Sequence, residues 1–460
     1  MIDRNQIPSS WEIVKLGEVC KNKEGLRRGP FGSAIKKEFF VSDGYKVYEQ
    51  SNAIYNDAIR GKYFIDEKKY QELINFSVLP GDLIVSCSGT LGRIAEIPFN
   101  AKPGVINQAL LRIRLLDNII SKKFFLYFFR SELFQRKIFD QSQGTAMSNL
   151  IGIKDFKEIE LLLPPLPEQQ AIVAKIEELL SDLENGKQQL QTAQQQLKVY
   201  RQSLLKWAFE GKLTNKNVKE GELPKGWKWV KLGEVLDFVG SGVTPKGGQS
   251  VYKTSGVVFL RSQNVYPNKL ELDDVAFITD EIDERMKRTR VKPNDVLLNI
   301  TGASIGRSAF VPPNLSRANV NQHVCILRAN QQLLDCAFLS SYLNSPQAQS
   351  EIMNTQSGAT RQGLNFQQIR NIEIPFPPIK EQQLIVDELE SKLTVCDKIE
   401  ETISHSLQQA ETLRQSILKK AFEGKLVAQN PNDEPASKLL GRIKAESAKS
   451  EVKKKNPEGM

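Results

Sequence analysis

The chain has 460 residues, of which 40% are apolar and 25% are charged, and its formal net charge is +9. A single hydrophobic core stops growing well below this length, so we expect two or more domains. The composition excludes a wholly disordered chain, and the lack of an 18-residue apolar run excludes a membrane-spanning helix. The N-terminal residues show no hydrophobic signal-peptide segment, so we expect a cytoplasmic protein.

Cysteine and histidine are both scarce, which limits the possible chemistry. The five cysteines include no Cys-x-x-Cys pair, and His323 and His405 are the only histidines. We therefore predict reduced, mostly structural thiols and no metal site. Two histidines also argue against hydrolase chemistry, which commonly uses a histidine as general base.

An internal repeat with a period of about 213 residues dominates the sequence. Trp11-Glu-Ile-Val-Lys-Leu-Gly-Glu-Val19 returns as Trp227-Lys-Trp-Val-Lys-Leu-Gly-Glu-Val235. Three short motifs also recur: Pro80-Gly-Asp returns as Pro293-Asn-Asp, Gly-x-x-Gly-Arg93 as Ser-Ile-Gly-Arg307, and Asn107-Gln108 as Asn321-Gln322. Pro164-Pro165 followed by Glu168-Gln-Gln returns as Pro377-Pro378 followed by Glu381-Gln-Gln. The segment Ala-Phe-Glu-Gly-Lys-Leu ends at Leu213 in the first copy and at Leu426 in the second.

The two copies agree closely at their ends, whereas residues 20–79 and 240–290 scarcely align. One scaffold that carries two different binding specificities would give this pattern. An old duplication that has merely drifted would give it too.

Each copy is predicted to begin with a mixed, strand-rich globular part. Short apolar runs between Gly and Pro residues indicate strands, and spacing of three to four between apolar residues indicates helices. The strands are expected at 83–85, 110–113 and 159–163, and at 296–298 and 324–327; the helices are expected at 124–138 and 338–352.

Each copy then continues as one long helix with a heptad pattern. In the first copy, apolar residues recur in steps of four and three from Ile172 to Trp207, and in the second from Ile385 to Ile417. Such a seam requires a partner helix, so the two helices are predicted to pair with each other. The alternative is that each helix packs on its own domain. Beyond Leu426 we expect a mobile tail with a short helix around 439–445.

These motifs, in this order and given twice, resemble the specificity subunits of type I restriction-modification enzymes. The resemblance covers residues 8–426. It includes Gly242-Val-Thr-Pro245, which resembles a family turn in the second copy, where the first copy has Gly29-Pro-Phe-Gly-Ser33 instead. The base preference of the first copy is therefore expected to differ.

The resemblance implies an α+β fold: two pseudo-symmetric mixed α/β globular domains separated by a long antiparallel two-helix coiled coil. The expected segments are a first target recognition domain at 1–163, a helical spacer at 164–215, a second recognition domain at 216–376, a second spacer at 377–426 and a flexible basic tail at 427–460. The chain itself would be non-catalytic and would hold no cofactor.

The expected partners are double-stranded DNA, two modification (methyltransferase) subunits and ATP-dependent restriction subunits. S-adenosylmethionine, ATP and Mg²⁺ would be bound by those partner subunits.

Candidate DNA-contacting residues lie in the two variable segments, where Arg, Lys, Asn and Gln can read base edges or hold phosphates. The first segment is a basic, Gly-punctuated stretch from Lys21 to Lys37. The candidates are Arg27, Arg28, Ser33, Lys36 and Lys37 in the first copy, and Ser241, Thr244, Lys246, Arg261, Gln263 and Asn264 in the second. Arg93, Arg307 and the two Asn-Gln pairs recur in both copies, which favours a scaffold role over base reading.

The sequence also bears on three other functions. Phe238-Val-Gly-Ser-Gly242 matches a loop of S-adenosylmethionine enzymes, but no Asp/Asn-Pro-Pro-Tyr/Phe motif accompanies it. The phosphate-binding loop of an NTP-driven motor is missing. A coiled-coil scaffold that assembles proteins without reading DNA stays open as the alternative function.

Overall fold

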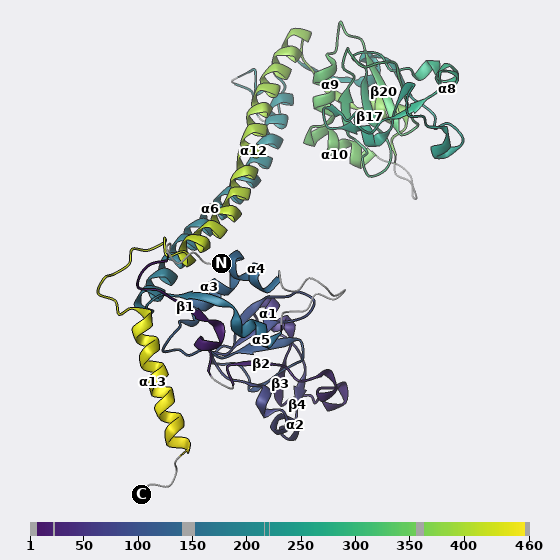
Figure 1. The fold of residues 1–460 in the computed structure, drawn as a ribbon. Helices are drawn as coiled ribbons and strands as arrows, with labels where there is room; N and C mark the ends of the chain where they lie inside the picture. The colour runs from purple at the N-terminus through teal and green to yellow at the C-terminus, as the bar shows by residue number, and fades with distance from the viewer. Residues whose placement is uncertain are drawn as a thin grey trace. The chain divides into compact units, whose positions relative to one another are not determined.

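The computed structural model describes residues 7–21, 24–139, 152–215, 217–219, 221–355 and 363–455. It divides into two compact units (Figure 1). Unit 1 comprises Met1–Gln188 with Ser406–Met460, and unit 2 comprises Gln189–His405. Each unit therefore contains half of each long helix, and each is described separately below.

Unit 1 carries the first globular domain. Its strands are β1 (Glu12–Lys15), β2 (Leu26–Arg28), β3 (Tyr45–Tyr48), β4 (Phe64–Ile65), β5 (Ser77–Val78), β6 (Leu83–Ser86), β7 (Ile94–Glu96), β8 (Gly104–Ile106), β9 (Leu110–Ile113) and β10 (Glu160–Leu163). Its helices are η2 (Leu16–Val19), η3 (Gly32–Ala34), η4 (Lys37–Phe39), α1 (Gln50–Tyr55), α2 (Glu67–Glu72), η5 (Ile74–Phe76), α3 (Lys122–Arg130), α4 (Glu132–Phe139) and α5 (Ile153–Glu158).

Unit 2 carries the second globular domain. Its strands are β11 (Lys228–Lys231), β12 (Leu236–Ser241), β13 (Val257–Leu260), β14 (Val265–Tyr266), β15 (Lys269–Leu270), β16 (Ala276–Ile278), β17 (Val296–Asn299), β18 (Ser308–Phe310), β19 (Ala318–Val320), β20 (Val324–Ala329) and β21 (Glu373–Phe376). Its helices are α7 (Leu232–Val235), η7 (Gly248–Val251), η8 (Ser262–Asn264), α8 (Asp280–Arg285), η9 (Lys287–Thr289), α9 (Cys336–Leu343), α10 (Pro346–Thr355) and α11 (Phe366–Asn371).

The two domains share one sheet topology. The order β2-β9-β6-β7 in the first corresponds to β12-β20-β17-β18 in the second, and β4-β3-β8 corresponds to β16-β13-β19. In both domains the second of these sheets contains one parallel pair, β3 with β8 and β13 with β19. The terminal strands of each domain also pair with each other, β1 with β10 and β11 with β21. The structure therefore confirms the predicted α+β fold class and extends the repeat into the segments that scarcely align.

The recurring aspartates stabilise the sheets. Asp82 lies 2.7 Å from Arg114 and Asp295 lies 2.7 Å from Arg328, in buried two-bond ion pairs. Each carboxylate also accepts a backbone N–H three residues earlier in the chain. A carboxylate with this many donors is satisfied inside the protein, so the Pro-x-Asp motif is structural.

The predicted helices at 124–138 and 338–352 are each two helices. In the first domain Ser131 separates α3 from α4, and its hydroxyl donates to the Phe128 carbonyl. In the second domain α10 begins at Pro346, whose ring cannot continue the preceding helix. The apolar spacing was interpreted correctly, but the breaks were missed.

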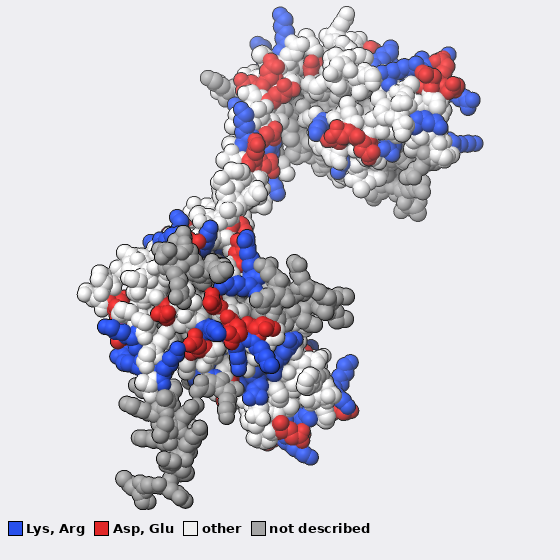
Figure 2. Space-filling model, in the orientation of Figure 1, with Lys and Arg blue, Asp and Glu red and all other residues white. Residues whose placement is uncertain are grey.

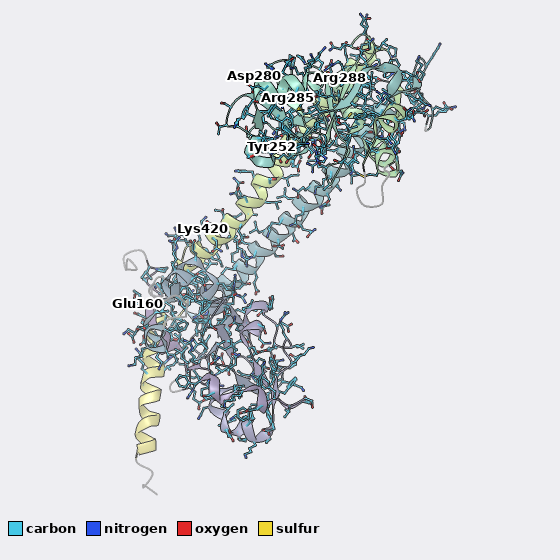
Figure 3. All side chains as sticks on the ribbon, turned by 90° about the vertical axis from the view of Figure 1, so that its right-hand side faces the viewer. Glu160, Tyr252, Asp280, Arg285, Arg288 and Lys420 are labelled. Atoms are coloured by element: carbon cyan, nitrogen blue, oxygen red, sulfur yellow. The ribbon has the colours of Figure 1, made fainter. Side chains whose placement is uncertain are left out.

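Two long helices, α6 (Leu166–Phe209) and α12 (Ile379–Phe422), lie side by side and antiparallel within each unit (Figures 1 and 3). In unit 1, Ile172 and Ile176 of α6 share a core cluster with Ile417 and Leu418 of α12. In unit 2, α6 and α12 likewise share a core cluster, and the Arg201 guanidinium lies 2.6 Å from the Asp397 carboxylate. The predicted pairing between copies is therefore confirmed.

The seam was predicted only in part. Ile172, Leu197 and Leu204 are buried as expected, but Trp207 and Leu413 are 40% and 51% exposed. Two helices alone cannot cover a full apolar stripe, and these side chains lie at its uncovered margin.

Each long helix begins on the domain that precedes it. Gln169, which is fully buried, accepts the Ser121 N–H at 2.7 Å and donates to the carbonyls of Ile119 and Pro164. Gln382 makes the matching bonds in unit 2, with the Asp335 N–H and the carbonyls of Leu333 and Pro377. We call these two sets of bonds the helix-start joints.

Each long helix ends on the other domain. The Phe422 ring at the end of α12 packs edge-on against Phe124 and Phe128 of α3, at 5.4 and 5.2 Å between centroids. At the end of α6, Phe209 packs in the same way on Phe338 and Tyr342 of α9. The Ala-Phe-Glu-Gly-Lys motif thus supplies the aromatic side chain that attaches each helix end.

The segment after Leu426 forms a longer helix than predicted, α13 (Ala436–Lys455). Ala436 and Leu440 are buried in the core of unit 1, and the Lys444 ammonium lies 2.9 Å from the Glu18 carboxylate. The first turns of α13 are therefore part of the folded unit rather than a mobile tail.

Replacing Gln169 with Ala is expected to destabilise unit 1 by about 2–4 kcal/mol, because one buried N–H and two buried carbonyls lose their partner. Calorimetric unfolding and amide exchange at Ser121 would measure this. Gln170→Ala is the matched control, since Gln170 belongs to the same motif but is exposed and should unfold like the parent chain. Equal effects of the two substitutions would contradict the structural role of the joint.

Candidate nucleic-acid interface

A cleft with a volume of about 1090 Å³ opens beside β2 in the first domain. Three of the five candidates of this domain line it, together with residues of two recurring loops. The lining side chains include Arg27, Arg28, Phe31, Ser33, Phe76, Ser88 and Gln108. Phe31 is 91% exposed at its rim. The cleft thus combines an arginine pair, a stacking-competent ring and a polar amide.

Lys36 and Lys37 do not line this cleft. Both are exposed on the segment that follows it, and the Lys36 ammonium lies 3.7 Å from the Glu38 carboxylate. Residues 22 and 23 of the predicted basic stretch lie outside the described residues. The stretch therefore divides into a part that faces the cleft and a part that faces solvent.

A buried arginine adds positive charge beneath the cleft. Arg112 on β9 pairs across the sheet with Arg27 and is only 2% exposed. Its guanidinium donates to backbone carbonyls, including Glu24 at 3.1 Å, and burial lowers its pKa to about 10. It is therefore still charged at neutral pH, which favours an anionic ligand at this surface.

A glycine holds the variable loop against the frame in each domain. A Cβ on Gly29 would meet the Asn107 carbonyl oxygen at 1.8 Å, and a Cβ on Gly242 would meet the Val320 carbonyl oxygen at 1.7 Å. Only a residue without a side chain permits this approach. The two loops therefore leave equivalent points of the fold and then carry different side chains.

The second domain brings Thr244 beside the recurring Asn-Gln pair. The Thr244 hydroxyl hydrogen-bonds the Gln322 amide oxygen. Ser241 ends β12 and is half-buried, and Lys246 is exposed in the same loop. Of these three candidates, Thr244 is the one that contacts Gln322.

Arg261, Gln263 and Asn264 form the η8 turn. Arg261 stacks on Tyr252 with its Cζ 5.5 Å from the ring centroid, and Gln263 donates to the Asp274 carboxylate at 3.2 Å. Asn264 is 1% exposed and its amide donates to the carbonyls of Glu271 and Asp274. Because that amide is fully used inside the loop, we remove Asn264 from the candidate interface.

The first domain contains the same turn, which the sequence comparison missed. Asn52 is fully buried, accepts the Glu49 N–H at 2.8 Å and donates to the carbonyls of Asp57 and Arg60. Glu49-Gln-Ser-Asn52 is therefore the counterpart of Arg261-Ser-Gln-Asn264. In the sequence, this correspondence is indicated by an asparagine at the fourth position of both segments.

The recurring loops have structural parts and exposed parts. Gln135 donates to the Gly92 carbonyl and Gln349 to the Gly306 carbonyl, which fixes the loops that carry Arg93 and Arg307. Asn107 and Asn321 each accept the N–H two residues later. These bonds support the expected scaffold role. Gln108 and Gln322 differ, because both side chains are exposed toward the variable loops.

A basic run in the second domain was also missed. Arg285, Lys287 and Arg288 are exposed and, in this fully described segment, have no ion pair. Met286 between them lies against Gly242, with its Cε 3.2 Å from the position of a Cβ. Figure 2 shows Lys and Arg side chains beside Asp and Glu over the part of unit 2 that carries α8, and Figure 3 labels Tyr252, Arg285 and Arg288 there. The run Arg-Met-Lys-Arg-Thr-Arg290 was visible in the sequence.

Other chemistry finds little support in the described part of the chain. No group of His, Cys, Asp and Glu there could hold a metal ion, and all five cysteines are free. Phe238 and Gly240, read as part of an S-adenosylmethionine loop, lie inside strand β12, and the Phe238 ring contacts the Arg328 guanidinium. A strand paired along its length cannot cradle a nucleoside as a loop does. No helix among the same residues is long and apolar enough to cross a bilayer.

Two copies of one fold that carry unlike basic surfaces are typical of a protein with two recognition sites. The family comparison agrees. The model of the type I restriction modification DNA specificity domain matches residues 8–192 and again residues 224–409. The chain belongs to this family and carries its domain twice.

Curated relatives agree with the family assignment, and a solved structure agrees with the fold. The chain is 29% identical to the type I restriction enzyme EcoBI specificity subunit of Escherichia coli, over 82% of each chain. It is 26% identical to the EcoKI specificity subunit of Escherichia coli strain K12, over 98% of each. Its fold is similar to the HsdS subunit from Thermoanaerobacter tengcongensis, with a TM-score of 0.60 at 23% identity over 91% of this chain and 98% of that one.

Asp283 on α8 should make the second domain sensitive to acid. Burial acts to raise the pKa of its carboxyl, but bonds from Asn319, Arg317 and Arg290 outweigh this and hold the pKa below 3.8. Because this pKa is lower in the folded domain than in the unfolded chain, ionised Asp283 stabilises the fold above about pH 4. This stabilisation is lost as the pH falls through the pKa of Asp283 in the folded domain.

Asp283→Asn is therefore expected to cost about 2–4 kcal/mol at pH 7, and the difference from the parent chain should shrink below about pH 4. Urea unfolding of the second domain across this pH range would measure it. Asp280→Asn is the control, since Asp280 is an exposed partner of Arg317 and should change stability little. A difference that does not vary with pH would contradict the assignment.

Proposed function

We propose that this chain is the DNA-reading specificity subunit of a type I restriction-modification enzyme. In this proposal each domain reads one half of a bipartite DNA target, and the chain directs adenine methyltransferase subunits, and restriction subunits, to that target. Methyl transfer and cleavage are carried out by the partners, which bind S-adenosylmethionine, ATP and Mg²⁺. The cytoplasm, where DNA is accessible, is the proposed location.

One observation carries the proposal: equivalent glycines, Gly29 and Gly242, start loops with different side chains from the same point of two copies of one fold. Arg27, Arg28 and Ser33 follow or flank the first glycine, and Thr244 and Lys246 follow the second. Phosphate contacts position a protein on DNA and contacts to base edges specify the sequence. Two such surfaces on one chain fit a target with two specified halves.

The paired helices support partner docking. Val199 of α6 and Leu384 and Val395 of α12, all within unit 2, are more than half exposed. A contiguous patch of exposed apolar side chains marks a protein-protein contact. We propose that the modification subunits dock there. The second candidate function, a scaffold that binds proteins only, explains this surface but gives no reason for the basic loops.

The basic run is expected to hold DNA phosphates. Replacing Arg285 and Arg288 with Ala should weaken binding about equally for all sequences and reduce the salt dependence of log K by about one per lost contact. Fluorescence binding of the assembled methyltransferase to its target at several salt concentrations would measure this. Lys175→Ala and Lys269→Ala, which remove lysines paired with Glu178 and Glu271, are controls of equal net charge change.

Changing one domain should change one half of the target. Replacing residues 20–160 with the matching segment of another family member is expected to alter one half-site, because each half is read separately. Inserting one heptad into each long helix, in α6 between Gln188 and Gln196, should instead lengthen the unread gap. Sequencing of methylated adenines in cells would test both. DNA methylation that never depends on this chain would favour the protein scaffold.

A further inference from the structure

Gln322 lies in a set of hydrogen-bonded side chains that we call the Gln322 clamp: Thr244, Gln322, His323 and Thr301. The Gln322 Nε2 lies 3.0 Å from the His323 Nε2. The other ring nitrogen of His323, Nδ1, lies 2.5 Å from the Thr301 hydroxyl. On the opposite side, the Thr244 hydroxyl bonds the Gln322 Oε1. Both ends of one exposed amide are therefore held by neighbouring side chains.

The bond directions follow from what each group can donate. An amide nitrogen only donates, so in the orientation drawn the His323 Nε2 is the acceptor. The proton of the neutral ring is then on Nδ1, which donates to the Thr301 hydroxyl oxygen. Thr244 donates to the amide oxygen. The reversed amide is satisfied equally well by the other tautomer, in which the His323 Nε2–H donates to the amide oxygen and the Thr244 hydroxyl accepts from the amide nitrogen, so each end of the amide has a partner in either orientation.

The backbone under the clamp is rigid. Asn321 accepts the His323 N–H at 3.0 Å, and the Ile300 N–H donates to the His323 carbonyl at 3.0 Å. Thr301 begins the small-residue loop whose Gly306 carbonyl accepts from Gln349. The groups that orient Gln322 are thus fixed by the sheet frame rather than by the variable loop alone.

The first domain lacks the clamp although it has the same glutamine. Gln108 occupies the position of Gln322 in the Asn-Gln pair, but Ala109 follows it where the second domain has His323. Counting from Gly29 and Gly242, Phe31 takes the position of Thr244. The amide of Gln108 therefore lines an open cleft without these partners. The clamp is a property of the second domain.

We propose that Gln322 is a base-reading residue of the second domain, that its ligand is an adenine edge in the major groove, and that His323 and Thr301 are the residues that position it. This inference rests on the proposed function, since it specifies how one of the two domains reads DNA.

The chemistry of the amide selects adenine. Within the clamp, the oxygen keeps one free lone pair and the nitrogen one free N–H. These match the N6 amino group and N7 of adenine, which form a two-bond contact with Gln, whereas guanine presents two acceptors.

The first experiment compares Gln322→Ala with Gln108→Ala in the full chain assembled with its modification subunits. Methylation of a library of DNA targets is the measurement. Gln322→Ala is expected to lose about tenfold to a hundredfold discrimination at one position of the second half-site and to leave the first half-site unchanged. Gln322→Met, which keeps the length of the side chain, should behave like Gln322→Ala. If the second half-site is unchanged in both Gln322→Ala and Gln322→Met, the inference is overturned.

The second experiment separates positioning from general structural support. Thr301→Val removes only the hydroxyl that holds the His323 ring, and His323→Ala removes the ring. In the parent chain, each substitution should reduce base discrimination at the same position of the half-site as Gln322→Ala does. In a chain that already carries Gln322→Ala, neither should reduce it further. A purely structural role would add its effect in both backgrounds, and this result would also overturn the inference.

The two levels of the proposal fail differently. If Gln322→Ala leaves the recognised letters intact while the assembly still methylates a split target, only the role of Gln322 is lost. If the unaltered chain does not confer sequence-dependent methylation at all, the proposed function fails first.

Discussion

The apolar seam of two 44-residue helices is the constraint on which the rest of the structure depends. Neither α6 nor α12 can bury its stripe of apolar residues alone, and each unit therefore contains the first half of one helix beside the second half of the other. The consequence reaches the globular domains. Phe422, from the end of the sequence repeat, completes the aromatic core around α3 in unit 1, and Phe209 does the same around α9 in unit 2. Each unit thus draws on both halves of the sequence.

The repeat, the long helices and the central strands could be predicted because they depend on local pattern. Leu83–Ser86 and Val296–Asn299 form strands almost where the apolar runs lie. The breaks at Ser131 and Pro346 were missed because the apolar face continues across them. Tail docking through Leu440 was missed because burial there depends on a surface that only the folded unit provides. The exposure of Leu413 has the same kind of cause, since the width of a seam is set by how many partners cover it.

For the candidate site residues, the chemical type of the side chain and the segment that carries it could be predicted from the sequence. Whether the polar groups of that side chain stay free to bind DNA could not. Asn264 has the right chemistry for reading adenine, yet its amide is consumed by two carbonyls of its own loop. Gln322 recurs in both copies and so was interpreted as scaffold, although its side chain is exposed beside Thr244. Hydrogen bonds between residues 78 positions apart leave no trace in one sequence. The two domains share a frame and differ in what surrounds equivalent side chains, which is how one fold can present two unlike surfaces.

The helix-start joints have a consequence for how such chains can diversify. Gln169 and Gln382 bond only to main-chain atoms, so the identity of the residues that they contact is of no energetic importance to them. The molecule already illustrates this, since Ile119 and Ser121 in one half are Leu333 and Asp335 in the other, with the same bonds made. A junction that ignores side chains tolerates recombination: a foreign module with the same backbone path can be accepted without any compensating mutation in the helix that receives it.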